Sequence, residues 1–316
     1  MKMDMENKIK AVILGHAAAD AVGVPAEFRS RTELDKHPVT DMRGHGTYNL
    51  PAGCWSDDTS MTLAALDSLA SGRVDYDEIM SNFGKWYLEG KYTPTGVMFD
   101  IGGTCRQAIL NYTRYNKKPL ECGRKDAHSN GNGSLMRILP FVLYSDFMPC
   151  QRLELIREAS MLTHAHPRAQ IGCLIYSILV THLLHWQSKA AIAHGLAHAM
   201  QLLQDEPEAE FYHRMFAPDY LWLERERIRS SGYVVDTLEA AVWCVMTTDS
   251  YEECVLKAVN LGEDTDTTAA VAGGLAGALY GLEGIPQEWL AELKRRKWIE
   301  EMCERAAKTW QNAVLY

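Results

Sequence analysis

The chain has 316 residues, of which 47% are hydrophobic, and its 32 basic and 41 acidic residues give a formal net charge of −9. This length can bury a large core as one domain or two. The longest basic block is the four-residue run at 294–297, so the sequence does not favour a phosphate-neutralising surface or a nucleic-acid partner.

The cysteines are scattered, and none forms a Cys-x-x-Cys pair. We predict that all eight are buried, reduced thiols rather than a disulfide framework or a zinc site: Cys54, Cys105, Cys122, Cys150, Cys173, Cys244, Cys254 and Cys303. The N-terminal segment is charged and lacks the apolar core of a signal peptide. The longest apolar run, at 171–186, is short for a membrane span and is broken by Thr181 and His182. A cytoplasmic protein with no membrane span is expected.

Helical spacing of apolar residues recurs along the whole chain, and no convincing two-residue alternation indicates a strand. The pattern predicts helices over 6–23, 57–72, 77–90, 101–115, 134–145, 151–163, 168–186, 188–204, 234–248, 250–260, 267–281 and 287–313. The composition of the polar segment 205–232 favours a solvated charged helix, and a surface excursion or a partner-binding element are the alternatives. We therefore expect an all-α fold in one compact domain, residues 1–316, and a monomer.

The stretch "CWSDDTSM" (54–61) places Ser56, Asp57 and Asp58 at a predicted helix start, with Thr59 beside them. One oxygen is enough to cap a helix, and capping alone remains an adequate explanation of this stretch. The excess of carboxylates also fits a bound cation. Carboxylate and hydroxyl ligands favour Mg²⁺, Mn²⁺ or Ca²⁺ over zinc or copper.

A second acidic cluster, "GEDTDTT" (262–268), has the same character and brings Glu263, Asp264 and Asp266 directly before a helix rich in Ala and Gly. Like charges this close repel. The two helix starts could share bound cations, and two metal ions bridged by one aspartate would resolve the repulsion. Glycine recurs every four residues at Gly273, Gly277 and Gly281, so one helix face carries almost no side chain. We expect this face to pack closely on the small-residue face of the helix over 6–23.

Three further stretches carry chemistry-bearing residues. "FDIGGTCRQAI" (99–109) places Asp100 beside a Gly-Gly turn, and "SNGNGSLMRILP" (129–140) is a Gly- and Asn-rich loop suited to presenting N–H groups to a phosphate. "THAHPR" (163–168) offers His164 and His166. Ordinary turns, caps and structural histidines explain each stretch equally well when it is taken alone.

Taken in order, "GHAAADAVGVPAEF", "WSDDTSM", "FDIGGTC", "SNGNGSLMR", "LTHAHP" and "GEDTDTTAAVAGGLAGALYG" resemble the ADP-ribosylglycohydrolases, in particular the dinitrogenase-reductase-activating branch. The resemblance runs from about residue 8 to 290 and includes "GYVVDTLEAAVW" (232–243). It implies a compact helical bundle of that type and two divalent ions, Mg²⁺ or Mn²⁺. It also implies removal of ADP-ribose from a modified protein side chain, with arginine as the expected linkage.

The resemblance also assigns roles to residues of this chain. Glu27 and Asp100 match catalytic carboxylates. The implied metal ligands are Ser56, Asp57, Asp58, Asp264, Asp266 and Thr267. The implied contacts to ADP-ribose are Gly102, Asn132, Gly133, Ser134, Met136, His164 and Tyr233. Two positions depart from the family: Glu263 stands where glycine is common, and Gly103 stands where close relatives have asparagine.

Two other enzyme classes lack their signatures in this sequence. An isoprenoid-diphosphate enzyme would show Asp-Asp-x-x-Asp, but Met61 occupies the last position, and the absence of a His-Asp dipeptide excludes an HD-type phosphohydrolase. Within the family, a hydrolase of serine-linked ADP-ribose or O-acetyl-ADP-ribose stays open. So does a non-catalytic ADP-ribose binder, such as a lens-crystallin-like relative.

Overall fold

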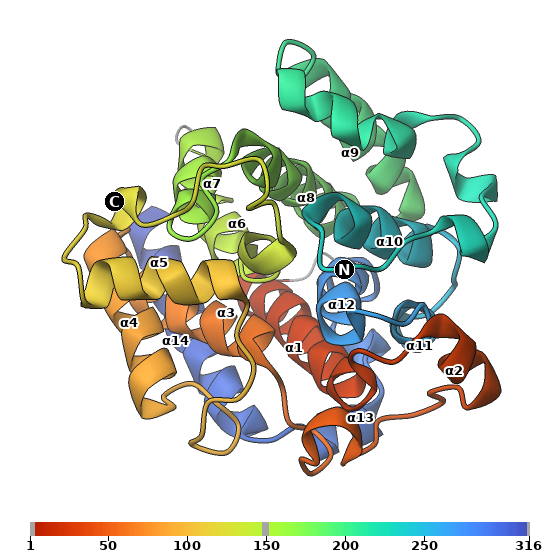
Figure 1. Ribbon diagram of the computed structural model, residues 1–316, viewed down its shortest axis with the longest axis horizontal. Helices are drawn as coiled ribbons and strands as arrows, with labels where there is room; N and C mark the ends of the chain where they lie inside the picture. Colours follow the sequence, from red (N-terminus) through yellow and green to blue (C-terminus); the bar gives the residue numbers. More distant parts are fainter. Residues whose placement is uncertain (1–3, 147–151, 315–316) are drawn as a thin grey trace.

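The computed structural model describes residues 4–146 and 152–314 (Figure 1). Over these residues the chain forms helices and three isolated β-bridges but no β-strand, which confirms the all-α prediction. The α-helices are α1 (Met5–Gly23), α2 (Arg31–Lys36), α3 (Asp57–Leu69), α4 (Tyr76–Glu89), α5 (Gly103–Thr113), α6 (Leu139–Ser145), α7 (Arg152–Met161), α8 (Pro167–Trp186), α9 (Lys189–Leu202), α10 (Val234–Met246), α11 (Tyr251–Val259), α12 (Thr265–Tyr280), α13 (Gln287–Glu292) and α14 (Arg296–Val314).

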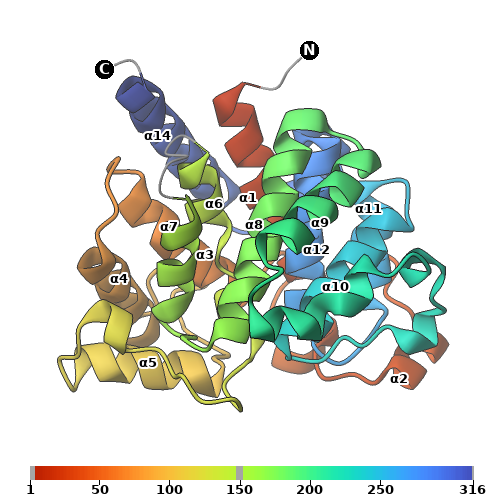
Figure 2. The same ribbon diagram turned by 90° about the horizontal axis from the view of Figure 1, so that it is seen from above.

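Helix α1 is central, with α14 packed along one side and α12 along the other (Figures 1 and 2). The contact between α1 and α12 is close because glycines lie in it, as the sequence predicted. A Cβ atom at Gly277 would lie 2.2 Å from the carbonyl oxygen of Ala11, and one at Gly273 would lie 2.3 Å from Cβ of Ala19. Only glycine allows this approach, which brings the end of α1 to the start of α12.

The same contact continues to the N-terminus of α12. A Cβ atom at Gly23 would lie 2.4 Å from Cα of Asp266, and the Thr265 hydroxyl donates to the Gly23 carbonyl at 2.8 Å. Gly281 differs from the other glycines of the predicted face, since it caps α12 with a φ of 75°. The small-residue faces therefore fix where the acidic N-terminus of α12 lies.

Most predicted helices appear within a few residues of their expected ends, and two were wrong in extent. The helix predicted over 134–145 begins at Leu139, after a 3₁₀ turn at Asn132–Ser134, because Pro140 is accepted only in the first turn. The helix predicted over 287–313 is interrupted between α13 and α14. There the Lys294 N–H donates to the Gly53 carbonyl at 3.0 Å instead of continuing the helix.

The segment 205–232 forms 3₁₀ turns rather than the charged α-helix that its composition favoured. These turns cover Pro207–Phe216, Tyr220–Trp222 and Arg225–Arg227. Tyr212, Met215 and Tyr220 are buried and anchor the segment to the helices. Prolines at 207 and 218 explain the short turns, because proline removes the N–H that a continuous helix needs. The remaining 3₁₀ turns are Val24–Ala26, Gly46–Tyr48, Pro119–Glu121 and Leu282–Gly284.

Two apolar helical stretches, Met5–Ala26 and Pro167–Trp186, are long enough to cross a membrane, but 94% and 78% of their apolar windows are buried inside the protein. Such burial is usual for core helices. The seven cysteines within the described ranges are free and buried, as predicted, and Cys150 lies outside those ranges.

Candidate active site

The two acidic clusters of the sequence meet at the N-termini of α3 and α12. Ser56 is the N-cap of α3, and its hydroxyl donates to Oδ2 of Asp58 at 3.0 Å. Asp264 is the N-cap residue of α12. The Thr267 hydroxyl donates to the same Asp58 Oδ2 at 3.2 Å, so a direct hydrogen bond joins residues 209 positions apart. Capping alone does not require two helix starts to converge in this way.

The carboxyl groups at this junction are buried and lack compensating positive charge. Asp57, Asp58 and Asp266 are at most 5% exposed, and among the residues described no basic side chain forms an ion pair with them. Burial raises the pKa of all three well above the usual range, and repulsion between the neighbouring carboxylates raises it further. Oδ1 of Asp58 is buried without a hydrogen-bond partner. A bound cation would offset the repulsion between the carboxylates and give the buried Oδ1 atom of Asp58 a partner.

Glu27 and Asp100 complete the acidic group from two other segments. One ligand oxygen each of Glu27, Asp100 and Asp266 lie within 4.8 Å of one another, so this group could hold a metal ion. Burial, followed by the charge of Asp100, raises the pKa of Glu27 to about 8, and its Oε2 atom is buried without a partner. Asp100 has a φ of 47°, a strained backbone of the kind that functional sites retain.

Two residues that the sequence analysis did not single out support these carboxylates. Asp20, fully buried in α1, accepts hydrogen bonds from the Ser56 N–H at 3.0 Å, the Thr59 N–H at 3.1 Å and the Thr59 hydroxyl at 2.6 Å. It therefore holds the start of α3 in place. The Tyr48 hydroxyl faces Glu27 and Asp100, and it lowers the pKa of each by less than burial raises it. An aspartate in the middle of an apolar helix was the available signal for Asp20.

The carboxylates open onto a cleft of about 370 Å³. Of the predicted site residues, the ones that line it are Glu27, Asp57, Asp100, Gly102, Asn132, Gly133, Met136, His164, Asp264 and Thr267. Ser56, Asp58 and Asp266 are buried next to this lining. Ser134 is fully buried and accepts a hydrogen bond from the Ser160 hydroxyl at 3.0 Å, so it lies in the wall rather than at the surface.

The Gly- and Asn-rich loop forms another part of the cleft lining. Asn132 donates from Nδ2 to Oδ2 of Asp264 at 2.8 Å, which ties this loop to the acidic group. Gly133 is required because a Cβ atom there would lie 2.7 Å from Sγ of Cys105 and 2.9 Å from Cε1 of His164. Burial lowers the pKa of His164 to about 3, so the imidazole is neutral at the cleft. Tyr233 is half-buried, and its hydroxyl accepts from Arg168 at 3.0 Å.

One edge of the cleft is a backbone clasp between two loops. The Phe28 N–H donates to the Glu263 carbonyl at 2.7 Å, and the Glu263 N–H donates to the Arg29 carbonyl at 2.8 Å. Phe28 and Glu263 both have positive φ values, 65° and 63°, and both side chains are exposed. A positive φ is a conformation that glycine adopts without strain, so Glu263 stands at a position suited to glycine, and its side chain extends into solvent beside the cleft.

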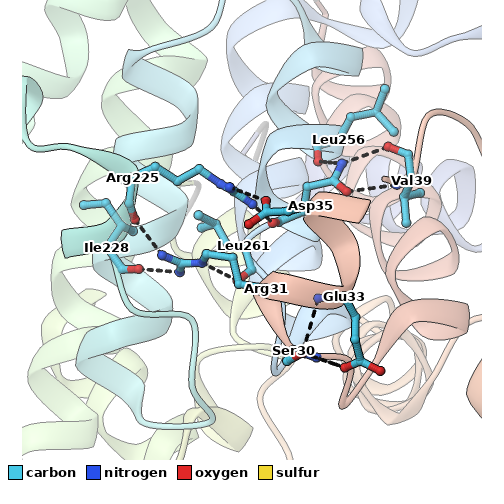
Figure 3. A network of polar contacts seen from close by, with 10 residues as sticks. Ser30, Arg31, Glu33, Asp35, Val39, Arg225, Ile228, Leu256 and Leu261 are labelled. Carbon is cyan, nitrogen blue, oxygen red and sulfur yellow. Dashed lines mark hydrogen bonds and ion pairs between the residues drawn. The ribbon is translucent and has the colours of Figure 1, made fainter. Parts of the chain in front are cut away.

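Arg31 binds the segments next to this clasp, and Figure 3 shows its contacts. Its guanidinium donates to the carbonyl oxygens of Leu261 at 2.8 Å, Arg225 at 2.7 Å and Ile228 at 2.6 Å. Arg225 in turn donates to Asp35 at 2.6 Å. This network joins the segment after Glu27 to the segment before Asp264, so it fixes the separation of the two loops that carry these carboxylates.

Comparison with known proteins identifies the class to which this fold and site belong. The sequence profile of ADP-ribosylglycohydrolase matches residues 1–314. The chain is 34% identical to "ADP-ribosylarginine hydrolase Tri1" of Serratia proteamaculans, covering 95% of this chain and 78% of that protein. It is 32% identical to "ADP-ribosyl-[dinitrogen reductase] glycohydrolase" of Rhodospirillum rubrum, covering 92% and 91%.

A solved structure agrees with these sequence relatives. The protein of an "ADP-ribosylglycohydrolase-related protein complex" superposes with a TM-score of 0.82 at 30% identity, covering 97% of this chain and 99% of that one. The chain belongs to the ADP-ribosylglycohydrolase family. The family resemblance expected from the ordered motifs is thereby confirmed.

Proposed function

We propose that this protein is a metal-dependent hydrolase that removes ADP-ribose from modified arginine side chains of proteins. The observation that carries the proposal is the convergence of buried, uncompensated carboxylates on one cleft in a chain of this family. Relatives at 32 to 35% identity over most of the chain carry the names ADP-ribosylarginine hydrolase and ADP-ribosyl-[dinitrogen reductase] glycohydrolase.

The donor atoms around the acidic group fit hard divalent cations. All are carboxylate or hydroxyl oxygens, and Oδ1 of Asp58 and Oε2 of Glu27 are buried without partners. We propose two ions, Mg²⁺ or Mn²⁺, held by Ser56, Asp57, Asp58, Asp264, Asp266 and Thr267. When bound, these ions supply positive charge that orients the hydroxyl groups of the distal ribose and activates water.

The remaining polar groups of the cleft bind and orient the substrate in this proposal. Asn132, held by Asp264, and the backbone at Gly102 and Gly133 face the ADP-ribose, and neutral His164 adds a polar contact without charge. Met136 supplies apolar lining, while Ser134 supports the loop from behind and Tyr233 borders it. Together these contacts hold the anomeric carbon next to the carboxylates.

Glu27 and Asp100 are the proposed catalytic residues. Both lie at the cleft, and each has an oxygen within 4.8 Å of the other's. One carboxyl group delivers a proton to the leaving guanidine nitrogen, and the other removes a proton from the attacking water. The same negative charge favours a guanidinium over the neutral ether oxygen of a serine linkage, which supports arginine as the preferred site of modification.

Three properties of the whole protein accompany this proposal. We propose that residues 1–316 act as one domain, that the protein works as a monomer and that it is cytoplasmic. The free, buried cysteines of the described ranges suit a reducing compartment. The substrate partner is an ADP-ribosylated protein, and ADP-ribose is the product.

The deciding experiment measures release of ADP-ribose from arginine-, serine- and aspartate-linked substrates, after chelation and after addition of Mg²⁺ or Mn²⁺. Arginine-linked substrate should be cleaved fastest, and only with metal. Asp266→Asn should reduce the rate to below about 1% of the parent's with helical content unchanged, because a lost ligand removes roughly 3 kcal/mol or more of transition-state stabilisation.

Asp249→Asn is the matched control, since this exposed aspartate pairs with Lys189 outside the cleft, and it should retain the parent's rate. Full activity after exhaustive chelation, or in Asp266→Asn, would overturn the metal mechanism. Faster release of ADP-ribose from serine than from arginine would show that the proposed arginine preference is wrong, without contradicting the metal-dependent hydrolase activity.

A further inference from the structure

A group of histidines lies on the hairpin of α8 and α9, outside the cleft. His182, which interrupts the longest apolar run of the sequence, lies on α8, and His194 and His198 lie on α9. Helix α9 packs against α8 at the outer edge of the molecule (Figures 1 and 2). His182 is 16 residues beyond His166, the N-cap of α8, which corresponds to roughly 24 Å along the helix.

The histidines meet because glycine lets the two helices approach. A Cβ atom at Gly195 would lie 2.9 Å from Cδ2 of Leu179 and 3.5 Å from Cγ of His182. His194 precedes this glycine, and His198 follows it by three residues. The close approach therefore places the His182 ring between the helices, beside the α9 face that carries both histidines.

The spacing of the ring nitrogens matches that of two ligands on one metal ion. Nε2 of His182 lies 3.3 Å from Nδ1 of His198. Two nitrogens that each bind zinc at about 2.05 Å in tetrahedral geometry are separated by roughly 3.3 Å. Two neutral imidazoles can also share one hydrogen bond at this distance, and the experiment below separates the two explanations.

A third imidazole, that of His194, lies on the same helix face, and its ring must turn to bring a nitrogen within 4.8 Å of the other two. His194 and His198 are four residues apart on α9, so their side chains project from neighbouring turns. His182 and His194 both line a cavity of about 510 Å³ that is also bordered by Trp186. His194 and His198 are exposed, so their rings can turn toward an ion without disturbing the core.

We propose that His182 and His198, joined by His194, form a binding site for a transition-metal cation of the zinc type, separate from the carboxylate centre. Imidazole nitrogens favour Zn²⁺, Ni²⁺ or Cu²⁺, whereas the oxygen-only cleft favours Mg²⁺ or Mn²⁺. The two sites therefore discriminate between classes of metal. A bound ion would link α8 to α9, because its ligands come from both helices.

Calorimetric titration with Zn²⁺ tests the proposal. Excess Mg²⁺ is present throughout, so that it occupies the carboxylate centre. The parent should bind one zinc ion, and His198→Ala should weaken that binding at least tenfold. Asp266→Asn should leave it unchanged. His37→Ala is the matched control, since this exposed histidine follows α2 and should not affect zinc binding.

Two further readouts exclude a folding artefact. Co²⁺ should give the visible absorption of a nitrogen-ligated tetrahedral ion in the parent and in His37→Ala, and this band should be lost in His198→Ala. Zinc should raise the melting temperature of the parent, and the rise should disappear in His198→Ala, whose metal-free melting temperature should equal the parent's. Three results would overturn the proposal: no zinc binding by the parent in the presence of Mg²⁺, zinc binding by His198→Ala as tight as the parent's, or loss of zinc binding in Asp266→Asn.

Discussion

Glu27→Gln should stabilise the metal-free protein, and the gain should grow from pH 5 to pH 8. Burial and the charge of Asp100 raise the pKa of Glu27 from 4.5 to about 8 in the folded protein. The folded state therefore holds this proton more tightly than the unfolded state, and folding stability falls as the pH rises through that interval. Glutamine keeps the shape of the side chain and removes the titration.

The magnitude follows from the two pKa values. A change of one pKa unit corresponds to about 1.4 kcal/mol, so the parent should lose roughly 3 to 5 kcal/mol between pH 4.5 and pH 8 that the variant does not lose. The Glu27 side chain is 5% exposed, so solvent screens this effect little. Urea unfolding of both proteins at pH 5, 6.5 and 8, with a chelator present, measures the difference.

Metal and a control variant complete the test. Mg²⁺ should reduce the difference in unfolding free energy between Glu27→Gln and the parent at pH 8, because a nearby cation favours the ionised carboxylate in the parent. Glu283→Gln replaces an exposed glutamate in the turn at Leu282–Gly284 and should follow the parent at every pH. If the parent and Glu27→Gln lose stability in parallel across this range without metal, the pKa of Glu27 is not raised in the folded protein.

Two other predictions concern the packing that positions the site. Gly277→Leu should lower the unfolding free energy by about 3 kcal/mol or more, since even a Cβ atom there would lie 2.2 Å from the Ala11 carbonyl oxygen. Gly103→Ala is the control, because a Cβ atom at that position meets nothing within 4 Å. If Gly277→Leu melts at the same temperature as the parent, the packing account is wrong. Arg31→Lys should cost about 2 to 4 kcal/mol and weaken Mg²⁺ binding, because an ammonium cannot replace three guanidinium hydrogen bonds. Arg227→Lys is the control, because Arg227 is exposed in the turn Arg225–Arg227, and it should change neither the urea midpoint nor the Mg²⁺ affinity. If Arg31→Lys leaves both quantities at the parent's values, the network does not hold the two loops in place.

Local signals made much of this fold and site predictable. The carboxylates of 56–58 and 264–266 exceed what two helix starts need, so their convergence could be expected before any coordinates. The four-residue spacing of Gly273 and Gly277 likewise predicted a close helix contact, which the structure confirms against α1. Both features depend on residues that are near one another in sequence.

Features that no local sequence pattern marks were not predictable. Tyr48 lies between Glu27 and Asp100 because of a loop conformation that no periodic pattern encodes. The break between α13 and α14 depends on a hydrogen bond from Lys294 to the Gly53 carbonyl, more than 200 residues away along the chain. The 3₁₀ turns of 207–227 depend on prolines, together with buried tyrosines whose partners are distant.

The hydrogen bond from Thr267 to Asp58 has a consequence for protein synthesis. Asp58 leaves the ribosome 206 residues before Asp264, and at 5 to 20 residues per second that interval lasts roughly 10 to 40 seconds. During this time the carboxylates of α3 have no partners from α12, so the centre does not yet exist. A chain that stops before residue 264 therefore carries only the first half of the acidic group. Under the proposed mechanism it cannot act on a modified protein until about five sixths of its 316 residues have been made.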